Sequence, residues 1–182
     1  MKKKTNRQTE EILSAGFGGQ GIMFMGKLFA AAGLAAGRFV TWMPSYGAEV
    51  RGGTAYSMAK ISKEEIASCV IGNPTILIVM NKPSLLKYEN SVAPGGVLIV
   101  NKSMVDELPR RKDIKVVNIP MTEIALKLGN VKCANMIAVG AVIKRSKTIT
   151  LRNVLSALKE SLKGKEDLFQ LNKSAVEKGY RL

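Results

Sequence analysis

Apolar residues along this chain form short continuous runs that alternate with longer stretches of helical spacing. Two runs, 75–80 (TILIVM) and 96–101 (GVLIVN), have the length and composition of central parallel strands buried on both faces of a sheet. Residues 11–17 (EILSAGF) have the pattern of a buried strand that ends at a tight turn, and 115–120 (KVVNIP) are predicted as a further strand. Two further strands are predicted at 38–47 and 54–62, on either side of a glycine-containing loop at 46–53.

Helices are predicted between and after these strands. The first begins near Gly21, and the others cover residues 82–92, 121–129, 134–146, 151–164 and 166–179. Strands that alternate with helices favour an α/β fold of three layers (α/β/α), with a mostly parallel, Rossmann-like sheet and a helical C-terminal segment. We expect a basic disordered tail at 1–9, a single α/β domain at 10–182, and a loosely attached C-terminal extension.

The first predicted helix lacks a polar face. Lys27 is its only charged residue between Ile22 and Gly37, and several alanines and glycines make its surface smooth. A helix with one side in solvent normally carries a polar stripe. We therefore expect the sheet to cover one side of this helix and another body, most naturally a partner subunit, to cover the other.

The composition excludes several kinds of chemistry. The chain of 182 residues contains no histidine, which rules out histidine-based acid–base catalysis and histidine metal ligands. Its two cysteines, Cys69 and Cys133, form no C-x-x-C pair, so this chain alone cannot build a thiolate cage for zinc or an iron–sulfur cluster. We expect both cysteines to be small buried hydrophobic residues and expect no metal site.

The formal net charge of +14 raises the hypothesis of a basic nucleic-acid-binding module. Residues 14–80, which hold the glycine motifs, contain only five Lys/Arg against three Asp/Glu, so the excess lies elsewhere. An acidic protein partner explains the same charge equally well. No secretory leader or membrane-spanning segment is recognised, and we expect a cytoplasmic protein without nucleic-acid or membrane partners.

The sequence GFGGQG at 16–21 places four glycines in six residues, between the first strand and the first helix. Such a turn brings the backbone close to a ligand, and the helix start favours an anion. The candidate cofactor-binding residues are therefore Gly16, Gly18, Gly19, Gln20 and Gly21. A stand-alone dinucleotide-binding oxidoreductase is one alternative. Such an enzyme needs an acidic residue about 20 positions after the glycine turn to hold the ribose, and none lies between Gly21 and Glu49. Simple strand–helix packing is another.

A second motif, YGAEVRGG at 46–53, places Glu49 and Arg51 two residues apart between glycines. One interpretation is a local ion pair, which contributes about 0–1 kcal/mol when exposed. The other is an arginine presented to a phosphate, a carboxylate or a partner subunit. The residues alone leave both open.

Together, GFGGQGIMFMGKLFAAAG, YGAEVRGGTAYSMAKIS and CANMIAVGAV resemble the γ subunits of 2-oxoacid:ferredoxin oxidoreductases in order and separation, from about Glu11 to about Lys147. The resemblance implies the pyruvate/ketoisovalerate oxidoreductase catalytic-domain type. It also implies a complex with α, β and δ subunits that oxidatively decarboxylates a 2-oxoacid to an acyl-coenzyme A and reduces ferredoxin. Thiamine diphosphate, magnesium and iron–sulfur clusters would belong to the partner subunits, with coenzyme A as cosubstrate.

This chain would then carry no catalytic residue and no cofactor of its own, and the isolated chain would be inactive. Its role would be assembly, with a share in the coenzyme A site. The resemblance adds these candidates for contact with a partner or with coenzyme A: Tyr46, Glu49, Arg51, Gly52, Gly53 and Asn135. The segment SYGAEVRGGTAYSMAKIS resembles the 2-oxoglutarate and branched-chain types more than the pyruvate type, so 2-oxoglutarate is the favoured substrate.

Overall fold

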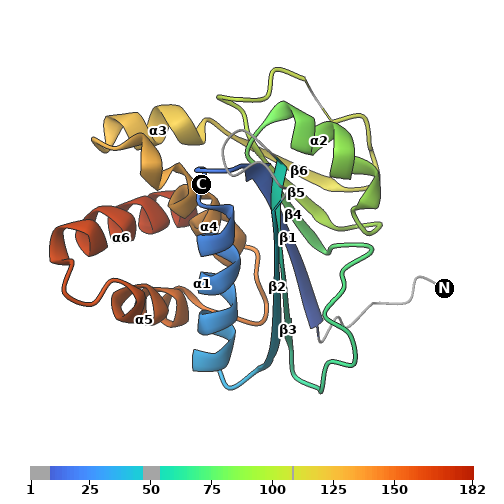
Figure 1. Ribbon diagram of the computed structural model, residues 1–182. Coiled ribbons are helices and arrows are strands. Elements are labelled where there is room, and N and C mark those ends of the chain that lie inside the picture. Colours follow the sequence, from blue (N-terminus) through green and yellow to red (C-terminus); the bar gives the residue numbers. More distant parts are fainter. Residues whose placement is uncertain (1–8, 47–53, 108) are drawn as a thin grey trace.

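The computed structural model describes residues 9–46, 54–107 and 109–182. Its strands are β1 (Thr9–Phe17), β2 (Phe39–Tyr46), β3 (Thr54–Ser62), β4 (Ile76–Val79), β5 (Val97–Asn101) and β6 (Lys115–Ile119). Its helices are α1 (Ile22–Ala35), α2 (Lys82–Tyr88), α3 (Met121–Lys127), α4 (Ala134–Ile143), α5 (Leu151–Ser161) and α6 (Glu166–Arg181), with short 3-10 turns at Glu89–Ser91 and Val131–Cys133 (Figure 1). The strands and helices predicted from the sequence are confirmed to within a few residues.

The strands form one sheet in the order β2-β3-β1-β4-β5-β6. β1, β4, β5 and β6 are parallel to one another, as predicted. β3 is antiparallel and lies between β1 and β2, pairing Phe17 with Thr54 on one side and Tyr46 with Ala55 on the other. The sheet is therefore mostly parallel, with one reversed strand that separates the first two strands of the chain. β1 begins at Thr9, one residue before the predicted start of the domain.

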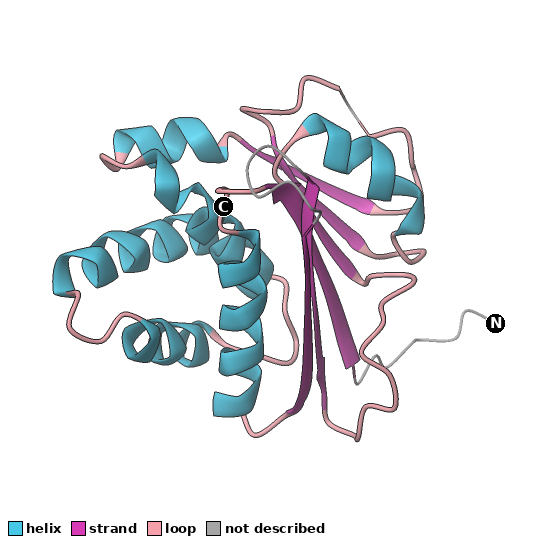
Figure 2. Ribbon diagram, viewed as in Figure 1, coloured by secondary structure: helices cyan, strands magenta, loops and turns pink. Residues whose placement is uncertain are grey.

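Helices cover both faces of this sheet, which confirms the three-layer arrangement. α1, α4, α5 and α6 lie on one face, and α2 lies on the other (Figures 1 and 2). β4 shows why its run of apolar residues is continuous. Ile76 and Ile78 join the core beneath α1 and α4, whereas Leu77 and Val79 join the core beneath α2.

The smooth surface of α1 is explained by contacts within the chain. A Cβ at Gly26 would lie 1.9 Å from Oγ of Ser57 in β3, so α1 rests almost directly on the sheet. On its other side α1 packs against α5, and Asn153 Nδ2 donates a 3.3 Å hydrogen bond to the carbonyl oxygen of Ala35. The expectation that a partner subunit covers this side of the helix was wrong, because α5 provides the cover.

The C-terminal helices belong to the core, so the expectation of a loosely attached extension was also wrong. All ten residues of α4 are buried. Its crossing with α6 is very close, because a Cβ at Gly140 would lie 2.0 Å from the carbonyl oxygen of Val176 and one at Gly179 would lie 2.0 Å from that of Ile137. Two glycines therefore let the backbones of α4 and α6 touch.

No helix within the described part of the chain combines the length and the apolar character needed to cross a bilayer.

Candidate functional site

The candidate site lies at the edge of the sheet where β1, β4, β5 and β6 end. After β1 the chain passes through α1 toward β2 and β3, and after β4 it passes through α2 on the opposite face toward β5. The crevice between the ends of β1 and β4 is thus the point where the direction of the fold reverses. In open α/β sheets, ligands bind preferentially at such switch points.

Gln20 spans this crevice with its side-chain amide. Oε1 accepts a 2.7 Å hydrogen bond from the backbone N–H of Phe17 and a 3.3 Å bond from Asn81 Nδ2. Nε2 donates a 3.4 Å bond to the carbonyl oxygen of Met80, at the end of β4. A Cβ at Gly16 would lie 2.5 Å from Gln20 Oε1, so Gly16 makes room for this bridge.

The positions of the turn that require glycine for their backbone angles are Gly19 (φ 92°) and Gly21 (φ 73°), which adopt the left-handed conformation. Gly18 does not adopt it, so the central residue of the predicted fingerprint is not where the turn requires glycine for its backbone angles. Gly19 is exposed, and a Cβ there would meet no atom of the described residues within 4 Å. The turn therefore presents open backbone at Gly19 and close packing at Gly16 and Gly21.

Asn135, in the first turn of α4, lies against this turn. Its Nδ2 donates a 3.4 Å hydrogen bond to the carbonyl oxygen of Gly21, which is the residue that caps α1. The side chain is 6% exposed, and its Oδ1 has no hydrogen-bond partner among the described residues. A buried acceptor without a partner is costly, by about 1–3 kcal/mol. An N–H or O–H donor supplied by a ligand or by another chain would satisfy it.

The structure thus brings Asn135 and the glycine turn together, although they lie more than one hundred residues apart. Glu49, Arg51, Gly52 and Gly53 lie outside the described residues, and nothing is described of the Tyr46 side chain. The strand ends that flank this segment border the same edge, because Thr54 pairs with Phe17. The contact roles of these five residues stay predictions.

Two polar residues of this edge were not identified from the sequence. Asn81 Oδ1 accepts a 2.9 Å hydrogen bond from the Ser84 N–H and caps α2. Asn101, at the end of β5, accepts a 3.1 Å bond from the Met121 N–H and donates a 3.0 Å bond to Thr122 Oγ1, at the start of α3. For Asn81, an asparagine between a buried strand and a helix is the signal that predicts such a cap, whereas Asn101 is separated from α3 by β6 and no local signal predicts its contact.

The geometry disfavours a stand-alone dinucleotide enzyme. In that fold an acidic residue at the end of the second strand, next to β1, holds the ribose. Here β3 lies between β1 and β2, so the end of β2 is about 10 Å from β1, two strand spacings away.

The described residues contain no group of three or more His, Cys, Asp or Glu side chains that would hold a metal ion. Cys133 is buried as predicted, and burial raises the pKa of its thiol. Cys69 is exposed, in the segment after β3, so the prediction that it is buried was wrong. The residue type alone does not distinguish a cysteine in a surface loop from a cysteine in the core.

Comparisons with known proteins agree with these features. Residues 11–182 match the family described as pyruvate ferredoxin/flavodoxin oxidoreductase. The ketoisovalerate oxidoreductase subunit VorA of Methanothermobacter thermautotrophicus is 32% identical over 166 residues, which is 91% of this chain but 34% of that protein. This chain therefore spans about a third of the length of that relative.

Two further proteins match over nearly their whole length. The 2-oxoglutarate synthase subunit KorC of M. thermautotrophicus is 33% identical over 184 residues, covering 94% of this chain and 97% of that subunit. The crystal structure of a keto/oxoacid ferredoxin oxidoreductase γ subunit from Geobacter sulfurreducens superposes with a TM-score of 0.82 at 26% identity, covering 94% of this chain and 96% of that one.

Proposed function

This chain belongs to the pyruvate ferredoxin/flavodoxin oxidoreductase family, and from that premise we propose that it is the γ subunit of a multi-subunit 2-oxoacid:ferredoxin oxidoreductase. The observation that carries the proposal is the family match over residues 11–182, which includes both α4 and α6 as well as the glycine turn. The likeness to γ subunits that was predicted from the sequence motifs is thereby confirmed. KorC and the G. sulfurreducens γ subunit support a separate γ chain, because each aligns over nearly its whole length.

In the proposed reaction, a 2-oxoacid, coenzyme A and two oxidised ferredoxins give an acyl-coenzyme A, carbon dioxide, two reduced ferredoxins and a proton. The bond between the carbonyl carbon and the carboxylate breaks, and a thioester bond to the coenzyme A sulfur forms. Thiamine diphosphate with magnesium supplies the decarboxylation chemistry, and iron–sulfur clusters carry the electrons, in the α, β and δ partner subunits. The isolated γ chain is expected to have no turnover of its own.

The share of this chain in that reaction is assembly and part of the coenzyme A site. Gly19 and Gly21 give the turn at the start of α1 its left-handed backbone angles, and Gly19 leaves the backbone open where N–H groups and the helix dipole favour an anion such as a phosphate. Asn135 Oδ1 accepts a hydrogen bond from the occupant, which must bring a donor. The amide and hydroxyl groups of coenzyme A, or the backbone of a partner subunit, meet that requirement. Arg51 is proposed to contact a phosphate or a partner carboxylate at the same edge.

We favour 2-oxoglutarate as the substrate, followed by branched-chain 2-oxoacids. The near full-length likeness to KorC supports this choice, and the likeness to VorA supports the second. We further propose that the complex works in the cytoplasm. The nucleic-acid-binding alternative has no support from the family match.

The proposal is tested by tagging this chain, purifying it from its own cells under native conditions, and identifying the subunits that accompany it. Thiamine- and cluster-binding subunits are expected, with coenzyme A-dependent reduction of ferredoxin. Comparison of kcat/KM for 2-oxoglutarate, 2-ketoisovalerate, pyruvate and arylpyruvate then identifies the substrate. A preference for pyruvate of about tenfold or more would overturn the substrate choice alone. Purification without such subunits would overturn the γ assignment.

A further inference from the structure

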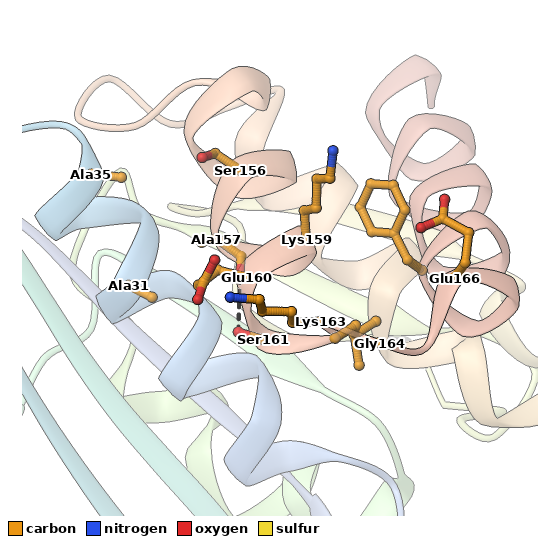
Figure 3. Close-up of a pocket in the computed structure, with 12 residues that line it drawn as sticks. Ala31, Ala35, Ser156, Ala157, Lys159, Glu160, Ser161, Lys163, Gly164 and Glu166 are labelled. Carbon is orange, nitrogen blue, oxygen red and sulfur yellow. Dashed lines mark hydrogen bonds between the residues drawn. The ribbon is translucent and has the colours of Figure 1, made fainter.

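α5 and α6 diverge and leave a groove on the helical side of the molecule. α6 packs against α4 through the close crossing at Gly140 and Gly179. α5 packs against α1 instead, where Ala157 of α5 and Ala31 and Ala35 of α1 line one hollow (Figure 3). Because α5 packs on α1 and α6 packs on α4, the side chains of α5 and α6 do not fill the space between these two helices.

Two adjoining hollows lie along the space between α5 and α6, with volumes of about 590 Å³ and about 460 Å³. They share Ser156, Lys159 and Phe169. The smaller hollow has an apolar floor and a basic rim. Its lining residues are Leu151, Leu155 and Phe169 on the floor, and Arg152, Ser156, Lys159 and Lys173 on the rim. We call this smaller hollow the α5–α6 groove.

The rim of the α5–α6 groove is strongly one-sided in charge. Arg152 and Lys159 are exposed, and neither forms an ion pair with any described residue. They are seven positions apart on α5, which places them on one face of the helix. Lys173 has one distant neighbour, Glu177 at 4.0 Å. Three cations thus surround an apolar floor, and none of the described residues that line it is a carboxylate, although Glu160 and Glu166 line the adjoining hollow.

We propose that the α5–α6 groove docks an acidic segment of another subunit, one that inserts leucine- or phenylalanine-type side chains between α5 and α6 and places carboxylates on Arg152, Lys159 and Lys173. Charge complementarity selects this occupant. A second copy of this chain also carries a net charge of +14 and would be repelled. The basic residues within 1–8 (Lys2, Lys3, Lys4 and Arg7) make the chain's own start equally unsuitable. The proposal rests on the chain being a subunit of a complex.

The first test compares two charge reversals that alter the net charge equally. Lys159→Glu combined with Lys173→Glu changes the rim of the groove, and Lys112→Glu combined with Lys115→Glu changes exposed positions at and just before β6, on another part of the molecule. The full chain is titrated with the partner subunits of the complex. The groove variant is expected to weaken association by at least about tenfold and to reduce its salt dependence, whereas the β6 variant stays near the parent.

A second test identifies the occupant. Ser156→Cys, in a Cys69→Ser background that removes the exposed native thiol, carries a photoactivatable benzophenone maleimide at the groove. In the assembled complex we expect cross-links to a partner segment with net negative charge and large apolar residues. Cross-links to a basic partner segment, or only to a second copy of this chain, contradict the proposal.

The remaining outcomes are also decisive. Equal affinity of the two charge-reversal variants for the partner subunits overturns the groove while leaving the γ assignment intact. Failure of the parent chain to bind any thiamine- or cluster-binding subunit overturns both. The parent chain is also tested for binding to phosphatidylserine vesicles. If it binds them, the groove variant does not, and assembly is unchanged, then the groove binds a membrane surface and the proposed protein segment is wrong.

Discussion

Gly21→Ala should destabilise the chain through two separable effects. Gly21 has φ 73°, a conformation that disfavours an alanine by about 1–2 kcal/mol. The new Cβ would also lie 2.1 Å from Asn135 Nδ2, so this side chain must rotate away. It then loses its hydrogen bond to the Gly21 carbonyl oxygen, which contributes about 0.5–1.5 kcal/mol. The two effects add to about 1.5–3.5 kcal/mol.

The assay is urea unfolding of the full chain, followed by circular dichroism, for the members of a double-mutant cycle. In the Asn135→Ala background only the backbone effect of Gly21→Ala remains, so its effect should fall to about 1–2 kcal/mol, giving a coupling of about 1 kcal/mol. Gly19→Ala is the matched control. Gly19 has φ 92° and open space around its Cβ position, so the change should show the backbone effect alone and no coupling to Asn135.

Equal effects of Gly21→Ala and Gly19→Ala, with a coupling below about 0.3 kcal/mol, would refute the contact between Asn135 and the glycine turn. The proposed position of Asn135 beside the coenzyme A site would then lose its structural basis.

Three further predictions follow from other contacts. Asn135→Ala should leave the midpoint of urea unfolding unchanged or higher, because removing a buried acceptor that has no partner among the described residues (about 1–3 kcal/mol) offsets the lost hydrogen bond to Gly21 (about 0.5–1.5 kcal/mol), yet it should raise the KM for coenzyme A or weaken assembly; normal assembly with a normal KM would exclude Asn135 from the site. Gly140→Ala should lower the free energy of unfolding by about 3 kcal/mol, because its Cβ would press on a backbone carbonyl, whereas Gly72→Ala, with open space, should stay within about 0.5 kcal/mol; equal stabilities would contradict the close helix crossing. In thiol titration of the folded chain, Cys69 should react and Cys133 should react only after unfolding, since burial also raises its pKa; two fast thiols would contradict that burial.

The sequence predicted the elements well because their patterns are local. The four residues ILIV of β4 are all apolar because both faces of this strand are covered, and α5 follows its amphipathic spacing closely. The order of the strands is a different matter. Nothing local in TAYSMAKIS says that β3 pairs antiparallel with β1 and separates it from β2, since that pairing is decided by contacts between segments far apart in the chain.

The candidate site was predicted only in part for the same reason. The glycine turn is visible in the sequence, but the φ angles show that glycine is required for the backbone at Gly19 and Gly21, not at Gly18. Asn135 was proposed from the family likeness, whereas its contact with Gly21, and the lack of a partner for its Oδ1 among the described residues, emerge only when α4 packs beside α1. The smooth surface of α1 correctly indicated a second cover, but the pattern could not tell α5 from another subunit.

The most direct test of the central claim is reconstitution of the complex from its separate subunits with this chain included or omitted. Coenzyme A-dependent reduction of ferredoxin by 2-oxoglutarate is measured in each mixture and with this chain alone. The account predicts activity in the full mixture, its loss when this chain is omitted, its return when the chain is added back, and none with the chain alone. Full activity without this chain, or turnover by the chain alone, would contradict the assignment of a non-catalytic γ subunit.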